Sequence, residues 1–444
     1  MIVSPAFAGK RYAVLGLARS GMSAAQTLLA SGSAVTAWDT REEAREALDG
    51  RAVIADPLTI DLAGFDGVVV SPGVPLNRHP IADYARGFGV PLIGDIELFA
   101  QARPSLPPHR VVAITGTNGK STTTKLVHHI CLAAGLPSRM GGNIGLPVLE
   151  QDPLPPGGIY VLELSSYQID LTYSLAADVA ALINVSPDHL DRYDGFAQYA
   201  EAKARLFAMQ AEDQDAVFGC GDAVTLEFAR REQARKPSNR VQVVDPAGLA
   251  GQADWPSLQG PHNLQNAAIA AEIARMLGIG EDVWRGAMAS FVGLPHRMER
   301  VADAGGVFYI NDSKATNPAS TAPALGAYPR IHWIVGGLPK GDDLDPCVPY
   351  YGHVVQAYTI GEAGPRFAEL LEPFMPVVRS EMLPNAVRQA MDAAMPGDVV
   401  MFSPACASFD QFRDFEARGD SFRAIVAALL AERGASAAPA GQGT

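Results

Sequence analysis

A glycine-rich segment between an apolar run and a threonine run has the composition of a phosphate-binding loop. It reads I-T-G-T-N-G-K-S-T-T-T from Ile114 to Thr124. The usual phosphate loop has four residues between its two glycines, whereas here only two separate Gly116 from Gly119, so the segment is a variant. Lys120 would reach the outer phosphates of a nucleotide, and the Ser121 hydroxyl would bind Mg²⁺.

The loop is expected to connect a strand to a helix. An apolar, β-branched run at residues 111–115 comes immediately before it, and a helix is predicted to begin near Lys120. At such a junction the backbone N–H groups and the positive end of the helix dipole surround an anion. An ordinary strand–turn–helix with a polar first turn is the alternative. Two glycines, a lysine and a serine in one such context favour the phosphate site.

Two later apolar segments end in side chains that could bind a metal ion. Residues 158–168, G-I-Y-V-L-E-L-S-S-Y-Q, are predicted to form a strand that ends at Glu163. An acid at the end of the strand beside a phosphate loop commonly holds Mg²⁺, and a buried carboxylate is costly without a partner. Residues 181–193 are predicted to form a strand that reaches Asp188 and His189. A solvated loop with a capping aspartate is the alternative there.

The first third of the chain contains another strand, glycine turn and helix. It reads Y-A-V-L-G-L-A-R-S-G-M-S, and the segment A-V-T-A-W-D-T-R at residues 34–41 is predicted to form a second strand that ends in Asp39. In dinucleotide folds an acidic residue about 20 positions after the glycine turn binds ribose. The G-x-G-x-x-G pattern is absent, because the next glycine after Gly16 is Gly21. The pattern therefore only slightly favours a Rossmann-like nucleotide binder over an NAD enzyme.

Alternation of short apolar runs with helical patterns predicts an α/β fold built on parallel strands. A further predicted strand, residues 67–70, runs into S-P-G-V, at the strand end where open α/β sheets bind ligands. Composition breaks at residues 103–110 and 292–297 indicate three domains. We predict their bounds as 1–94, 95–295 and 296–444, with a disordered low-complexity end at 434–444.

Composition limits the classes of function. The 444 residues are 48% hydrophobic and 19% charged, as expected for a globular protein. A formal net charge of −13 argues against sequence-independent binding of nucleic acid. The four cysteines form no C-x-x-C pair, which argues against a disulfide framework or a zinc site. Without a signal peptide or an apolar run approaching about 20 residues, we expect a soluble cytoplasmic protein with no membrane partner.

Together, these motifs resemble the Mur ligases, which build the peptide stem of bacterial cell-wall precursors, along essentially the whole chain. The resemblance also rests on G-G-N-I-G (141–145), G-P-H-N-L-Q-N (260–266), L-P-H-R-M-E (294–299), N-D-S-K-A-T-N (311–317) and S-P-A-C-A-S-F-D-Q-F (403–412). The last segment, with D-T-R at Asp39 and S-P-G at Ser71, resembles the branch that adds D-glutamate. The phosphate loop alone is shared with folylpolyglutamate synthases.

The resemblance implies ATP-dependent formation of an amide bond between D-glutamate and UDP-N-acetylmuramoyl-L-alanine through an acyl phosphate, a cytoplasmic step of peptidoglycan precursor synthesis. A carboxylate is a poor electrophile until ATP phosphorylates it, and two anionic reactants need cations to meet. The resemblance also implies a monomer with three domains. These are an N-terminal Rossmann-like domain for the UDP substrate, a central P-loop-type ATPase domain and a C-terminal Rossmann-like domain for the amino acid.

Site residues follow from the same resemblance, motif by motif. Catalysis is assigned to Lys120, His189, Lys203 and Lys314. The ATP site takes Gly116, Thr117, Asn118, Gly119, Lys120, Ser121, Thr122, Asn266, Arg297 and Asp312. The UDP substrate takes Ser20, Asp39, Thr40, Arg41, Gly73, Asn143 and His189. The amino acid takes Thr316, Lys340, Ser408, Phe409 and Phe415. The ligands of two Mg²⁺ ions are assigned as Ser121, Glu163, His189 and the carbamate form of Lys203.

Lys203 shows how far the resemblance changes the interpretation. By local sequence it is a surface lysine in a predicted amphipathic helix, residues 199–207. As a carbamate it would offer Mg²⁺ an anionic oxygen, which an ammonium group cannot do.

Two features depart from the family pattern. Arg19 could contact the phosphate or uracil or point to solvent, and Leu338-Pro339 stands before Lys340 where a more polar pair is expected.

Three other functions compete with this interpretation. A nicotinamide-dependent oxidoreductase would explain the first third but leaves the phosphate loop and the candidate metal ligands unexplained. A ligase of the same family that extends folate shares the loop. A non-enzymatic nucleotide-binding regulator is disfavoured, because a full set of candidate metal ligands is present.

Overall fold

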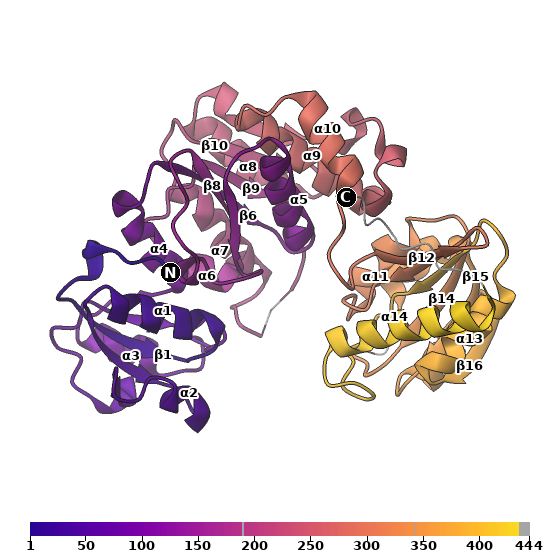
Figure 1. The fold of residues 1–444 in the computed structure, drawn as a ribbon, viewed down its shortest axis with the longest axis horizontal. Coiled ribbons are helices and arrows are strands. Elements are labelled where there is room, and N and C mark those ends of the chain that lie inside the picture. Colours follow the sequence, from indigo (N-terminus) through magenta and orange to yellow (C-terminus); the bar gives the residue numbers. More distant parts are fainter. Residues whose placement is uncertain (189–190, 342, 435–444) are drawn as a thin grey trace. The chain divides into compact units, whose positions relative to one another are not determined.

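The computed structural model describes residues 1–188, 191–341 and 343–434. The chain forms two compact units (Figure 1), one from Met1–Gly248 with Gln265–Ala287 and one from Leu249–Leu264 with the chain from Met288 onward. Strands and helices alternate in three sheets, which confirms the predicted α/β class. Within the described ranges, no helix has the length and apolar character needed to cross a bilayer. The domain bounds stay predictions, and residues 435–444 of the predicted disordered end lie outside the described ranges.

The first sheet has five parallel strands in the order β3–β2–β1–β4–β5. They are β1 (Arg11–Leu15), β2 (Ala34–Trp38), β3 (Val53–Ile54), β4 (Gly67–Val70) and β5 (Leu92–Ile93). Its helices are α1 (Arg19–Ala30), α2 (Glu42–Glu46), α3 (Ile81–Gly87) and α4 (Asp95–Ala102). Alternate side chains of β1 enter different apolar clusters, Val14 in one and Ala13 in the other. The strand order reverses between β1 and β4, so the loops after them open on one crevice.

The second sheet has six parallel strands in the order β11–β10–β9–β6–β8–β7. They are β6 (His109–Thr115), β7 (Ser138–Gly142), β8 (Gly158–Glu163), β9 (Val179–Leu182), β10 (Asp215–Gly219) and β11 (Val241–Val244). The helices are α5 (Lys120–Ala133), α6 (Ser166–Asp170), α7 (Phe196–Ala208), α8 (Ala223–Arg235), α9 (Pro261–Met276) and α10 (Glu281–Ser290). Every residue of β8 is buried, as a strand covered on both faces requires.

The third sheet, in the second unit, has the order β12–β13–β17–β14–β15–β16. Its strands are β12 (Glu299–Ala304), β13 (Val307–Asn311), β14 (Ile331–Gly336), β15 (Val354–Ile360), β16 (Val377–Glu381) and β17 (Val399–Phe402). Only the pairing of β12 with β13 is antiparallel among these described strands. Its helices are α11 (Pro318–Leu325), α12 (Gly364–Leu371), α13 (Leu383–Ala393) and α14 (Phe415–Glu432). Trp333 and Ile334 enter apolar clusters on opposite faces.

Two predicted strands end earlier than expected. The strand predicted to reach Asp188 is β9, which ends at Leu182, so Asp188 lies in the loop that follows. The strand predicted to end in Asp39 is β2, which ends at Trp38, so Asp39 is the first residue after it. The carboxylate of Asp39 is used in turn contacts, where it accepts from Leu17 N and Arg41 N.

Candidate functional site

The glycine-rich segment forms the turn between β6 and α5, as predicted. Gly119 has a φ of 84°, and a Cβ there would lie 2.2 Å from Asn266 Oδ1, so a larger residue does not fit. Asn184 fixes the loop from outside. Its backbone carbonyl accepts from Thr117 N at 2.9 Å, and its side-chain carbonyl accepts from Asn118 N at 2.9 Å. The turn is thus held rigidly in front of the helix N-terminus.

Two lysine Nζ atoms converge on one carbonyl oxygen of this loop. Lys120 Nζ donates to Gly116 O at 2.9 Å and to Thr117 O at 2.8 Å. Lys203 Nζ, from α7, donates to the same Gly116 O at 2.9 Å. Burial, reinforced by the charge of Lys120, holds the pKa of Lys203 well below its usual value. The charge of Lys120 in front of a helix N-terminus concentrates positive potential, which suits an oligophosphate.

The interpretation of Lys203 as a surface residue is wrong, because its side chain is only 2% exposed. Its Nζ lies 4.7 Å from the centre of the Tyr199 ring. Tyr199, Leu206 and Phe207 are also buried, and their spacing defines the inward face of α7. Lys203 falls on that face, four residues after Tyr199. The helical spacing therefore indicates that Lys203 faces inward, although its charged neighbours in sequence suggest an exposed position.

Glu163 ends β8, as predicted, and is paired in register with Ile114 of β6. Its Oε1 accepts from Asn143 Nδ2 at 2.8 Å, while Asn143 N donates to Glu163 O at 2.8 Å. Its Oε2 is buried and has no hydrogen-bond partner among the described residues. A buried carboxylate oxygen left over in this way has the chemistry to bind a hard cation such as Mg²⁺.

The residues present therefore fit a Mg²⁺ site at the phosphate loop. Ser121, in the first turn of α5, is buried and supplies a hydroxyl oxygen beside the Glu163 strand. No three side chains of the types His, Cys, Asp and Glu gather as metal ligands within the described part of the chain. The fit thus rests on one carboxylate and one hydroxyl. His189, which the sequence assigned to the metal and to the UDP substrate, lies outside the described residues.

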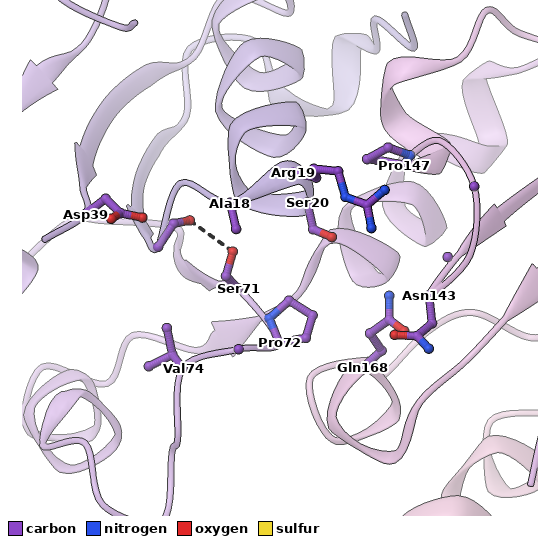
Figure 2. Close-up of a pocket in the computed structure, with 14 residues that line it drawn as sticks. Ala18, Arg19, Ser20, Asp39, Ser71, Pro72, Val74, Asn143, Pro147 and Gln168 are labelled. Carbon is purple, nitrogen blue, oxygen red and sulfur yellow. Dashed lines mark hydrogen bonds between the residues drawn. The ribbon is translucent and has the colours of Figure 1, made fainter. Parts of the chain in front are cut away.

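A cavity of about 340 Å³ opens where the loops after β1 and β4 face the second sheet of the same unit (Figure 2). Its lining residues are Gly16, Ala18, Arg19, Ser20, Asp39, Ser71, Pro72, Gly73, Val74, Gly142, Asn143, Gly145, Pro147 and Gln168. The structure thus brings together four of the residues predicted for the UDP substrate, namely Ser20, Asp39, Gly73 and Asn143. Thr40 and Arg41 do not line the cavity.

The glycine turn at this cavity is packed against the loop after β4. Gly16 has a φ of 85°, and a Cβ there would lie 2.9 Å from Ser71 Cβ. Ser71 Oγ donates to Gly16 O at 3.0 Å, the bond that Figure 2 marks. This close approach explains why the position requires glycine.

Asp39 anchors the same turn from behind. Its Oδ2 accepts from Leu17 N at 2.6 Å and from Arg41 Nη2 at 3.2 Å. Its Oδ1 accepts from Arg41 N at 2.9 Å and from Arg41 Nε at 3.1 Å. The side-chain bond to Arg41 is the main reason that the pKa of Asp39 falls to about 2, so the carboxyl is ionised at neutral pH. A carboxylate has about four lone-pair directions, and four donors occupy them here.

Sequence reasoning left Arg19 open and did not assign Gln168. Arg19 lines the cavity, and its guanidinium extends toward the side where Pro147 and Gln168 lie (Figure 2). Gln168 belongs to the quoted motif E-L-S-S-Y-Q, and its side chain caps α6 by accepting from Ser165 N at 3.2 Å. The Ser-x-x-Gln spacing was a readable capping signal, but nothing local indicated that this residue also faces the cavity.

The remaining residues assigned to ATP divide between the two units. Asn266 lies in the first unit, where its Oδ1 accepts from Thr123 Oγ1 at 3.3 Å. Asp312 lies in the second, accepting from Met298 N at 3.1 Å and from Ser403 Oγ at 2.7 Å. Burial raises the pKa of Asp312 to about 6. Arg297 Nε is buried without a hydrogen-bond partner among the described residues, which suits a ligand donor.

The residues assigned to the amino acid all lie in the second unit, where two of them, Lys340 and Thr316, are in contact. Lys340 Nζ donates to Thr316 Oγ1 at 3.4 Å. Lys314 Nζ lies 4.8 Å from the centre of the Phe415 ring. Ser408 is buried, whereas the neighbouring Phe409 is 69% exposed. The pairing of Lys340 with Thr316 means that Leu338-Pro339 does not keep this lysine away from its predicted partner.

Comparisons with known proteins point to one family. The Mur ligase middle domain matches residues 114–250, and the Mur ligase glutamate ligase domain matches residues 296–406. A UDP-N-acetylmuramoylalanine–D-glutamate ligase from Novosphingobium aromaticivorans is 77% identical over 433 residues, covering 98% of each chain. The ligase of the same name from Sphingopyxis alaskensis is 58% identical over 435 residues, covering 97% of this chain and all of that one.

Solved structures show the same fold at much lower identity. A MurF ligase from Thermotoga maritima in complex with ADP superposes with a TM-score of 0.58 at 16% identity, covering 97% of this chain and 96% of that chain.

Proposed function

This chain belongs to the Mur ligase family, and we propose that it joins D-glutamate to UDP-N-acetylmuramoyl-L-alanine with cleavage of ATP. The product is a precursor of peptidoglycan. One observation carries the proposal. The 77% identity to a ligase named for D-glutamate addition extends over 98% of both chains. Relatives of the same name at 58% and 54% identity cover the chain almost as fully.

The reaction needs the acceptor carboxylate to become an electrophile. Transfer of the outer phosphate of ATP gives an acyl phosphate, which the amine of D-glutamate attacks with release of phosphate. Lys120 neutralises the outer phosphates, and the backbone N–H groups of the first turn of α5 bind them. Mg²⁺, when bound, neutralises charge between the two anionic reactants. Ser121 and Glu163 hold one ion.

A second ion is assigned to His189 and to Lys203 as a carbamate. Burial of Lys203 and its lowered pKa support the assignment, because only a neutral amine adds carbon dioxide. The amine nitrogen forms a bond to the carbon, one proton leaves, and the product is an anionic carbamate. Its oxygens would supply the hard ligand that Mg²⁺ prefers. The charge of Lys120 next to it favours an anion in that position.

The substrates are assigned to separate parts of the molecule. The UDP substrate takes the cavity lined by Ser20, Asp39, Gly73 and Asn143, with Thr40 and Arg41 at the same turn. The nucleoside of ATP takes Asn266, Arg297 and Asp312, with Gly116 to Thr122 and Lys314 at its phosphates. D-Glutamate takes Thr316, Lys340, Ser408, Phe409 and Phe415, with Lys340 and Thr316 at one carboxylate. The domain bounds 1–94, 95–295 and 296–444, a monomeric state and a cytoplasmic location belong to the same proposal.

The test is phosphate release from ATP in the presence of UDP-N-acetylmuramoyl-L-alanine and a panel of D- and L-amino acids. We expect release with D-glutamate and none with L-glutamate or without the UDP substrate. Release that depends on folate and L-glutamate would identify a folate-extending ligase instead. Binding of NAD without any ATP turnover would favour an oxidoreductase.

A further inference from the structure

Arg418, in the first turns of α14, is a buried guanidinium at the centre of three loops of the second unit. Its side chain is 1% exposed. Nε donates to Ser313 Oγ at 3.1 Å, and Nη2 donates to Ser313 O at 2.8 Å. Nη1 donates to Ala407 O at 2.9 Å, and Nη2 also donates to Cys406 O at 3.0 Å. Ser313 lies in N-D-S-K-A-T-N, whereas Cys406 and Ala407 lie in S-P-A-C-A-S-F-D-Q-F.

The third loop, G-G-L-P-K-G at residues 336–341, packs directly on the same group. A Cβ on Gly337 would lie 3.0 Å from Arg418 Nη1 and 2.5 Å from Ala407 O. Gly337 has a φ of 136°, which an L side chain rarely adopts. Leu338 and Ala407 exchange backbone hydrogen bonds of 3.0 and 2.9 Å. The loops that carry Thr316, Lys340 and Ser408 therefore meet at one guanidinium.

The four acceptors of Arg418 are neutral, since three are backbone carbonyls and one is a hydroxyl. Burial lowers its pKa to about 10, so it stays charged at neutral pH. A buried cation is a costly way to pack three loops, because an apolar side chain of similar volume often stabilises a core as well or better. The planar fork does what an apolar group cannot, which is to fix the relative positions of carbonyls on separate loops.

We propose that Arg418 is the positioning residue of the amino-acid site, and that its fork sets the spacing of Lys340, Thr316 and Ser408 for a dicarboxylate amino acid. The guanidinium is buried beneath the loops and acts through them without touching the substrate. The inference rests on the proposed function. A change in Arg418 should therefore weaken the use of D-glutamate while leaving the UDP substrate, which is assigned to the other unit, unaffected.

Arg418→Lys tests this, since lysine keeps the charge but loses the planar fork. We expect the KM for D-glutamate to rise about tenfold or more, with the KM for the UDP substrate within about twofold. Leu430→Ala is the matched control, because Leu430 is buried in the same helix among apolar residues away from the three loops. It should lower the melting temperature without changing the KM for D-glutamate.

Ser313→Ala gives a second variant, which removes the hydroxyl that accepts from Arg418 Nε and donates to Phe415 O at 2.9 Å. We expect the KM for D-glutamate to rise about threefold. When Ser313→Ala is combined with Arg418→Lys, the two increases should be less than additive in free energy, because both changes remove the bond from Nε to Ser313 Oγ. If Arg418→Lys does not fold, Ser313→Ala decides alone. An unchanged KM for D-glutamate in folded Arg418→Lys or in Ser313→Ala, or an equal rise in Leu430→Ala, would overturn the inference. Wild-type protein that ignores D-glutamate would instead overturn the proposed function.

Discussion

Two regions of the first unit use the same backbone arrangement with opposite charges. In each, a parallel strand runs into a glycine turn and a helix, β6 into α5 and β1 into α1. At the first turn, the Nζ atoms of Lys120 and Lys203 both donate to the Gly116 carbonyl. At the second, the carboxylate of Asp39 accepts from Leu17 N. A glycine turn before a helix therefore does not by itself identify a phosphate site.

The difference teaches which residues define the ligand. At both turns the helix N-terminus favours an anion. The phosphate loop adds the cation of Lys120 from its own helix, whereas Asp39 already places an anion at the other turn. Four donors of the protein occupy the Asp39 oxygens, so the carboxylate organises the turn. An acid that binds ribose needs free acceptor capacity, so Asp39 serves the cavity by holding its turn and not as a dinucleotide fold would use it.

The largest effect is expected from removing the cation of the phosphate loop. Lys120→Ala should abolish ATP-dependent formation of the acyl phosphate, with turnover lower by about 10³-fold or more, because the outer phosphates lose their neutralising group. The measurement is phosphate release at saturating substrates. Lys125→Ala, in the same helix, is the control and should keep near-normal turnover. A Lys120→Ala enzyme with normal turnover would remove the phosphate-loop assignment.

Lys203→Ala should lower turnover by about 10²-fold or more while the fold stays intact, because the proposed metal loses an anionic oxygen ligand. Acetate or formate at high concentration should restore part of the rate by occupying the vacated space. Lys236→Ala is the matched control. Lys236 is also buried and donates to Gln210 Oε1 at 2.7 Å, but it lies outside the site.

Lys236→Ala should lose stability, keep turnover and show no response to acetate. Full activity of Lys203→Ala would end the carbamate proposal, since an ammonium that only bonds to a loop carbonyl is not needed for chemistry.

Asp39→Asn tests the other turn. An amide keeps the shape but loses the charge and two of its acceptor directions, so the bonds to Leu17 and Arg41 weaken. We expect the KM for the UDP substrate to rise about tenfold, since a hydrogen bond to a charged group contributes about 1.5–3 kcal/mol, with the KM for ATP unchanged. Asp83→Asn, at an exposed ion pair of the same sheet region, should change neither. Equal rises in both KM values would mean that the two turns are coupled.

Ser408→Ala and Phe415→Ala should each raise the KM for D-glutamate, by about threefold to thirtyfold, with nucleotide binding little changed. Both residues belong to the unit that holds Lys340 and Thr316, whereas the phosphate loop belongs to the other unit. Phe374→Ala, an exposed aromatic of the same unit, is the control. Unchanged glutamate kinetics in both variants would place the amino-acid site elsewhere.

Local features of the fold could be predicted, because they depend on neighbours in sequence. The run before Gly116 is continuous and β-branched, and β6 and α5 meet at the loop where the sequence placed them. Burial of Lys203 depends on which face of α7 turns inward. In the sequence, only the spacing of Tyr199, Leu206 and Phe207 indicates that face.

Arg418 could not be predicted from the sequence. Its main partner, Ser313, is 105 residues away along the chain. A single arginine near a helix start looks like any solvated one, and only the meeting of distant loops around it reveals its environment.

The smallest effect on catalysis, and the sharpest contrast within one region, is expected from Asp95 at the start of α4. Its carboxyl is buried near Ser20 and Gln168, which line the cavity, and neither oxygen makes a hydrogen bond of normal geometry among the described residues. Burial raises its pKa to about 6, above about 3.9 in an unfolded chain. The folded state therefore holds this proton more tightly, and stability falls as pH rises from about 4 to about 6.

Asp95→Asn is neutral at every pH and should remove this loss. We expect the variant to be more stable than wild type at pH 8, by about 2–3 kcal/mol, and no more stable at pH 4. Asp39→Asn should behave oppositely at pH 8, because the pKa of Asp39 is about 2 and its charge stabilises the fold above about pH 4. Urea unfolding at the two pH values measures both, and the KM for the UDP substrate should change less than about twofold in Asp95→Asn. An Asp95→Asn protein less stable than wild type at pH 8 would mean that the ionised carboxylate is held by contacts that outweigh its burial, and the contrast between the two acids of this region would fail.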